Sequence, residues 1–177
     1  LVPNISNNIE VQYILKQNYL FSISYSLSKN AIYQTATQDN TNNSITLSPY
    51  NIDKSQTITV NSNLTFKLYD WWDFNFNGIL FYDKIHSNTP KIFQENISAQ
   101  VVTTNTFSLS NQIKFEVSTD YVSPSIQGSY KTFDLLLYNA GISKSFLDNK
   151  FKIALIGNDI FKTYKIVAHI YKYVTSD

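Results

Sequence analysis

Long stretches of strictly alternating apolar and polar residues constrain this chain most. In residues 57–68 every apolar side chain lies at an even position, from Ile58 to Leu68, and Thr, Asn and Lys occupy the odd positions. Successive side chains of a β-strand point to opposite faces, so this pattern places one face in an apolar medium and the other in a polar one. Residues 21–28, 73–77 and 113–121 repeat it, and no comparable helical pattern appears. We therefore predict an all-β, antiparallel fold.

The length of these stretches separates two kinds of β protein. Strands of soluble sandwiches have about five or six residues, whereas membrane strands need about 9–11 to cross at a tilt. Residues 57–68 contain no Gly or Pro, and the apolar phase is kept across the turn-prone Asn61, Ser62 and Asn63. Charged residues make up 15% of the chain, which is a low fraction for a soluble protein. Aromatic residues make up another 15%, which is a high fraction. We predict a transmembrane β-barrel, with a soluble sandwich as the alternative.

The links between the predicted strands alternate in character. Short links are expected at residues 16–18, 70–73, 110–112 and 148–150, and longer polar links at 39–43, 87–90 and 123–128. Outer-membrane barrels have this asymmetry, with the short turns on the periplasmic side. It yields about eight or nine antiparallel, up-and-down strands. Trp71 and Trp72 lie at a short link, where we predict that they anchor the barrel at the membrane interface; ordinary core or surface stacking is the alternative.

The ends of the chain bear on whether the predicted barrel is complete. The sequence starts at Leu1 and stops at Asp177 without an evident closing strand. An open sheet in lipid would expose two unpaired edges, which a bilayer does not tolerate. Either the strands close as a small barrel of about eight, or other strands complete the wall. We expect residues 1–177 to be a single partial barrel domain.

Several segments of the chain, taken in sequence order, carry a resemblance to a known family. They are residues 1–3, 8–13, 25–26, 51–55, 67–72, 123–128, 141–147 and 158–163. Together they resemble the TonB-dependent receptor barrels of the Bacteroidota outer membrane protein β-barrel family. Residues 158–163, which include Asp159, Ile160 and Phe161, are similar to a motif near the end of receptor barrels, except that Lys162 replaces the expected Asn or Asp.

The resemblance implies the C-terminal portion of a barrel of about 22 strands in the cell outer membrane. In such a receptor an N-terminal plug, energised through TonB, serves the import of a scarce nutrient such as a siderophore, glycan or peptide. The plug, the TonB-contacting segment and the closing strands are expected to be absent from residues 1–177. The implied partners are outer-membrane lipid, the rest of the barrel, the plug, TonB through that plug, and a surface lipoprotein.

The sequence contains no pattern typical of catalysis or metal binding. Cysteine is absent, and His86 and His169 have no second ligand at a metal-binding spacing. No nucleophile elbow or phosphate-binding loop is present, and a formal charge of +1 argues against nucleic acid as a partner. We therefore expect no enzyme activity, no catalytic residue, no metal and no cofactor.

Aromatic residues near the predicted outer rim are the candidate ligand contacts. They would form a stacking platform for a glycan or siderophore, and packing in a membrane girdle or loop is the alternative. These candidates are Phe81, Tyr82, Tyr121, Tyr130 and Phe133.

Three hypotheses make different structural predictions. A piece of a large receptor barrel has antiparallel strands in sequence order, outward apolar side chains and no contact between its first and last strands. A complete eight-stranded barrel with a structural or adhesion role has hydrogen bonds between those two strands. A soluble carbohydrate-binding sandwich has two stacked sheets that bury the apolar residues between them.

Overall fold

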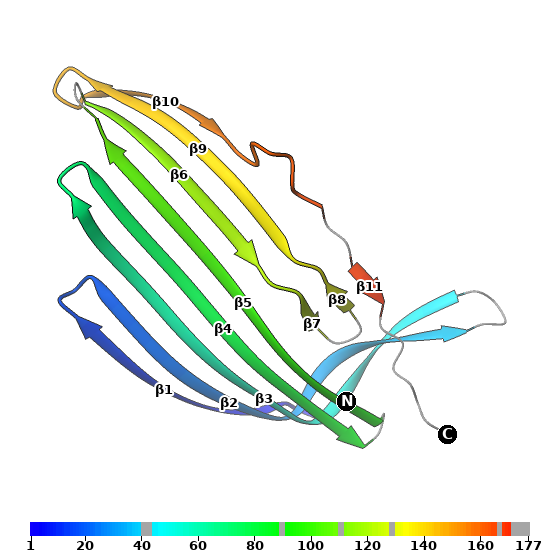
Figure 1. Cartoon of the computed structure of the whole chain (residues 1–177). Helices are drawn as coiled ribbons and strands as arrows, with labels where there is room; N and C mark the ends of the chain where they lie inside the picture. The colour runs from blue at the N-terminus through cyan, green and yellow to red at the C-terminus, as the bar shows by residue number, and fades with distance from the viewer. Residues whose placement is uncertain (40–43, 89–90, 110–111, 128–129, 166–167, 171–177) are drawn as a thin grey trace.

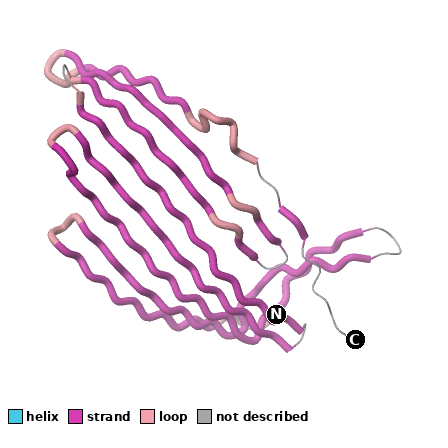
Figure 2. The backbone as a smooth tube through the Cα atoms, viewed as in Figure 1, coloured by secondary structure: helices cyan, strands magenta, loops and turns pink. Residues whose placement is uncertain are grey.

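A computed structural model describes residues 1–39, 44–88, 91–109, 112–127, 130–165 and 168–170. Its regular elements are β-strands (Figures 1 and 2). In chain order they are β1 (Ile5–Leu15), β2 (Tyr19–Asp39), β3 (Ser44–Tyr69), β4 (Trp72–Asn88), β5 (Lys91–Ser108), β6 (Ile113–Val122), β7 (Ser125–Gln127), β8 (Tyr130–Thr132), β9 (Leu135–Phe146), β10 (Phe151–Gly157) and β11 (Ala168–Ile170). In the part of the chain that is described, no helix has the length and apolar character needed to cross a membrane.

Eight strands form one antiparallel sheet in the order β1-β2-β3-β4-β5-β6-β9-β10. Neighbours in this sheet follow chain order, except that β9 follows β6. The intervening strands β7 and β8 form a separate small sheet, to which β11 adds as the third strand in the order β11-β8-β7. The predicted all-β, up-and-down sheet of about eight or nine strands is confirmed. Strands β1 and β10 are its two edges, so the ring of hydrogen bonds that a closed eight-stranded barrel requires is not formed among the described residues.

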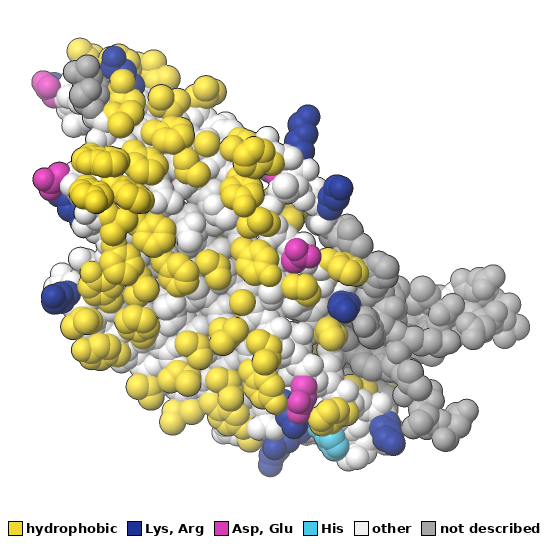
Figure 3. Space-filling model, in the orientation of Figure 1, with side chains coloured by type: hydrophobic (Ala, Val, Ile, Leu, Met, Phe, Trp, Pro, Cys, Tyr) yellow, Lys and Arg dark blue, Asp and Glu magenta, His cyan; other side chains and the backbone are white. Residues whose placement is uncertain are grey.

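The sheet has one apolar and one polar face. The apolar face carries the even positions of β3 and β4, so that Val60 pairs with Leu80 and Leu64 with Phe76. The polar face carries the odd positions, so that Thr65 pairs with Asn75. Figure 3 shows hydrophobic side chains spread over the strands of the apolar face, with charged groups mostly at its margins.

The apolar face is uncovered. Among the described residues the buried hydrophobic side chains are Ala31, Ile52, Ile85 and Ile92, although 43% of the chain is hydrophobic. A sandwich would bury the alternating apolar residues between two sheets, whereas here Ile23, Val60 and Leu80 remain 40–52% exposed. A soluble sandwich is therefore not the fold.

The observed turns agree only in part with the predicted asymmetry between short and long links. Short turns occur where expected at residues 16–18, 70–71 and 147–150, and β5 ends and β6 begins on either side of the fourth. At the opposite end, however, β4 continues to Asn88 and β5 starts at Lys91, so the first two residues of the link expected at 87–90 belong to a strand, and the other two lie outside the described residues. The asymmetry lies in strand length, because β2 to β5 extend well past β6 and β10 on that side.

The far half of the β2–β3 hairpin leaves the sheet. Strand β3 pairs with β4 only from Lys54 onward, at the level of Asn30, whose positive φ of 56° marks the bend. Beyond the bend, Ile52 packs with Ile85 and Ile92, which belong to the polar face, and with the partly buried Tyr33. The hairpin therefore folds over the polar side and forms the small buried core of the molecule.

Candidate functional site

Aromatic rings form a ladder of two stacked groups on the apolar face next to the short turns. Ring centroids 5.2–6.1 Å apart connect Tyr19 of β2 to Phe66 and Phe74, and connect Trp72 through Phe107 to Phe115 of β6. Trp71 and Trp72 lie at the centre of this ladder and stack on each other at 6.0 Å. The indole N–H of Trp72 donates to Asn105 Oδ1 at 3.0 Å. Amphipathic rings in such a row suit a membrane–water interface, and the interface role of the two tryptophans remains a prediction.

A row of tyrosines marks the other margin of the apolar face. Tyr25, Tyr82 and Tyr121 project from β2, β4 and β6 on the apolar side, where each pairs with apolar-face residues. The Tyr25 hydroxyl accepts a hydrogen bond of 2.6 Å from Gln56 Nε2. Gln56 pairs with Leu27 and so lies farther from the short turns than Tyr25 does. The apolar face is therefore bordered by aromatic residues on both sides.

The height of this apolar band matches a bilayer. Trp72 and Tyr82 of β4 are ten residues apart, which at about 3.3 Å per residue is about 33 Å along the strand. At a strand tilt of about 40° the same stretch spans about 25 Å, the height of the apolar band on outer-membrane barrels.

The polar face is held together by short hydroxyl, amide and carboxylate side chains. Thr57 donates to Asp83 at 2.7 Å, and Thr65 donates to Asn75 at 2.9 Å. Asn139 of β9 donates to both Ser118 and Asp120 of β6 at 3.1 Å. Short polar side chains that hydrogen-bond across neighbouring strands suit a hydrated lumen.

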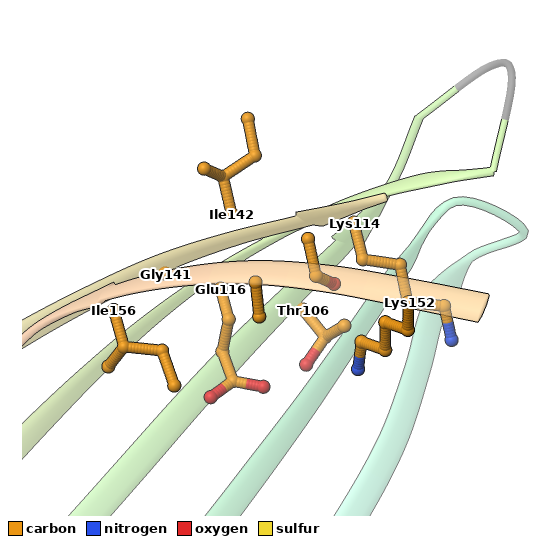
Figure 4. Close-up of a pocket in the computed structure, with 9 residues that line it drawn as sticks. Thr106, Lys114, Glu116, Gly141, Ile142, Lys152 and Ile156 are labelled. Carbon is orange, nitrogen blue, oxygen red and sulfur yellow. The ribbon is translucent and has the colours of Figure 1, made fainter. Parts of the chain in front are cut away.

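A hollow of about 170 Å³ lies on the polar face between β5, β6, β9 and β10. Thr106, Lys114, Glu116 and Lys152 project into it together, whereas Ile142 points to the opposite side (Figure 4). A second hollow of about 150 Å³ adjoins it and shares Glu116. The alternation in sequence predicts the polar direction of Lys114 and Glu116, but it gives no register, so the approach of Lys152 from β10 was not predicted.

The predicted rim residues do not share one surface. Phe81 belongs to the polar face, where it lines a hollow of about 140 Å³ with Ser98 and Gln100, whereas Tyr82 and Tyr121 belong to the apolar face. Phe133 lies in the link between β8 and β9, and the side chain of Tyr130 lies outside the described residues. Phe81 and Tyr82 do not belong to one stacking platform, because consecutive strand residues point to opposite faces. A ligand-binding role for the predicted rim residues stays a prediction.

Among the described residues, the histidines and carboxylates do not come together in one centre. His86 is exposed near the end of β4, and the side chain of His169 lies outside the described residues. Within the described part of the chain no three His, Asp or Glu side chains are placed to hold a metal ion.

Asp159 organises the turn that follows β10. Its carboxylate accepts hydrogen bonds from the Thr163 N–H at 2.8 Å and the Tyr164 N–H at 3.1 Å, and the Thr163 hydroxyl donates at 2.9 Å. Burial raises the pKa of the Asp159 carboxyl, but these hydrogen bonds outweigh it and hold the pKa below its ordinary value. The turn packs Phe161 edge-on against Tyr138 of β9.

Comparison with known protein families shows to which family the chain belongs. The model of the outer membrane protein beta-barrel family matches residues 1–175. The chain belongs to this family. No curated protein and no solved structure matches the chain. Membership agrees with the apolar band and the polar face: the chain is β-barrel wall located in a membrane.

Proposed function

We propose that this barrel wall belongs to a TonB-dependent-receptor-like protein of the outer membrane that binds and imports a scarce nutrient. The observation that carries the proposal is the open sheet, whose edges β1 and β10 have no partner among the described residues. An unpaired edge in lipid costs several kcal/mol per unsatisfied backbone group, so further strands must complete the wall.

A wall of more than eight strands encloses more than side chains. Barrels of about eight strands are filled by their own residues, whereas those of about 22 strands enclose a plugged lumen. The hollow around Lys114, Glu116 and Lys152 then faces that lumen, where a plug or a polar ligand would contact it. This arrangement supports transport of a siderophore, glycan or peptide by a protein of the kind found in Bacteroidota, with no catalytic step. Its further partners would be the plug, TonB and a surface lipoprotein.

The test uses the complete gene product in its own cells. A panel of radiolabelled ferric siderophores, cobalamin, fluorescent oligosaccharides and peptides is offered to wild-type cells, to cells lacking this gene and to cells lacking TonB. We expect one class of probe to accumulate in wild-type cells alone. Uptake that requires the gene but not TonB would contradict the receptor mechanism.

A second measurement addresses the plug independently of the ligand. A plugged barrel conducts little in a planar bilayer, so the purified gene product should show no stable open channel until the plug is removed. A large resting conductance in the intact protein would indicate an open pore instead.

A further inference from the structure

Lysine side chains collect at the margin of the apolar face farthest from the short turns. Lys29 of β2 and Lys54 of β3 are direct cross-strand partners on that face, and Lys54 is in turn paired with His86 of β4. Lys91 of β5 projects from the same face one step beyond Phe93, the partner of His86. Figure 3 shows lysine side chains, a histidine and an acidic side chain at the lower margin of this face.

The Lys29–Lys54 pair lacks an internal counter-charge. Like charges directly opposite each other destabilise a sheet, yet in the described part of the chain neither lysine takes part in an ion pair, and both are exposed. Lys84, one row closer to the middle, differs because it forms an ion pair with Glu95. The outermost lysines are therefore the uncompensated cations of this margin.

The distance of Lys29 and Lys54 from the apolar band indicates which anion they would bind. Tyr25 lies four residues before Lys29 on β2, so the lysine stands about 13 Å along the strand, or about 10 Å in height, beyond the tyrosine border. Lipid phosphates lie just outside the hydrocarbon layer. Since the lysines continue the face that meets the acyl chains, the anion nearest to them belongs to the lipid.

From this geometry we infer that Lys29, Lys54 and Lys91 form a binding site for the phosphate of an acidic lipid headgroup in the leaflet opposite the short turns. The inference rests on one part of the proposed function, namely that the apolar face is in contact with membrane lipid. Each lysine near an anionic membrane surface contributes about a fivefold gain in affinity, and two contribute about 30-fold.

The test measures lipid binding to the complete gene product in detergent by native mass spectrometry, with dioleoyl phosphatidic acid as the probe and phosphatidylcholine as the headgroup control. The double variant Lys29→Gln/Lys54→Gln should bind phosphatidic acid about 30-fold more weakly than the wild type. Lys29→Arg/Lys54→Arg, which keeps the charge, should bind it normally. The matched control Lys144→Gln removes a lysine from the same face near the short turns and should have no effect on this site.

Three results would overturn the inference: unchanged affinity of the Gln double variant, an equal loss in Lys144→Gln, or full competition by millimolar inorganic phosphate, which would indicate a site for the free ion. Insertion is followed separately by quenching of Trp71 and Trp72 fluorescence with brominated phosphatidylcholine in vesicles. Failure of the wild type to insert would refute the proposed function, whereas insertion with unchanged lipid affinity would refute the lipid site alone.

Discussion

A lysine placed at Ile23 distinguishes a lipid-facing surface from a solvent-facing one. Ile23 lies on the apolar face of β2, between Val11 and Val60, and is 52% exposed. It stands four residues past Tyr19 of the aromatic ladder, about 13 Å along the strand and about 10 Å into a band about 25 Å high. In water, a substitution at so exposed a position changes stability by about 0.5 kcal/mol. In lipid near this depth, lysine costs about 2–4 kcal/mol.

The matched control is Ser24→Lys. Ser24 is the next residue of β2, carries its side chain on the polar face and pairs with Glu10. A lysine at this position therefore adds the same charge on the aqueous side, next to a carboxylate. We expect this variant to be neutral within about 1 kcal/mol.

The assay is reversible unfolding of the complete protein in phospholipid vesicles by guanidinium chloride, followed by tryptophan fluorescence. Ile23→Lys should lose about 3 kcal/mol relative to Ser24→Lys, which is roughly a 150-fold change in the folding equilibrium constant. A difference between the two variants of less than about 1 kcal/mol would refute the assignment of the faces.

Three further predictions concern packing, the pH response and the bent hairpin. A Cβ at Gly78 would lie 2.7 Å from Phe76 Cε1, so Gly78→Ala should cost about 1 kcal/mol in the presence of the ring and less in a Phe76→Leu background, as a double-mutant cycle of unfolding energies measures. Because the folded pKa of Asp159 is lowered from 3.8, its contribution is complete above about pH 4 and is lost as the pH falls through the folded pKa; amide-exchange protection at Thr163 should follow that course. Ile52→Ala, at a side chain 1% exposed, should destabilise the hairpin by about 2–5 kcal/mol, measured as faster amide exchange in residues 31–34.

Each of these has a control with an opposite expectation. Gly141→Ala meets no atom closer than 3.6 Å and should be tolerated, so an equal cost would argue against the ring contact at Gly78. Asp159→Asn should abolish the pH dependence at Thr163; persistence would assign it to another group. Ile32→Ala, at a half-exposed position, should leave exchange in the hairpin nearly unchanged, and a large effect there would contradict the buried core around Ile52.

Alternation was sufficient to predict the strands and their two faces. Side chains such as Ile58 and Thr59 differ in polarity at every step, and a two-residue period has one structural meaning. The short turns were equally predictable, because clusters such as Asp148 and Asn149 adopt the positive φ of tight turns.

Register and long-range folding were not predictable in the same way. The separation of Phe81 from Tyr82 follows from the strand period, whereas a position near a loop in the sequence does not tell which face a side chain occupies. The bend at Asn30 depends on one backbone angle and on contacts of Ile52 with residues more than 30 positions away. The hollow around Glu116 requires the pairing of β6 with β9 and of β9 with β10, which no local pattern specifies.

A single-cysteine scan along β4 tests the central claim most directly, and the absence of cysteine from residues 1–177 makes each label unique in this region. Spin labels at residues 73–82 of the complete protein in vesicles are exposed to oxygen, which concentrates in lipid, and to a water-soluble nickel chelate. The even positions, such as Phe76 and Leu80, should be accessible to oxygen, and the odd positions, such as Asn75 and Asn77, to the nickel chelate. Loss of the two-residue alternation, or alternation with the two faces exchanged, would contradict a barrel wall with its apolar face in lipid.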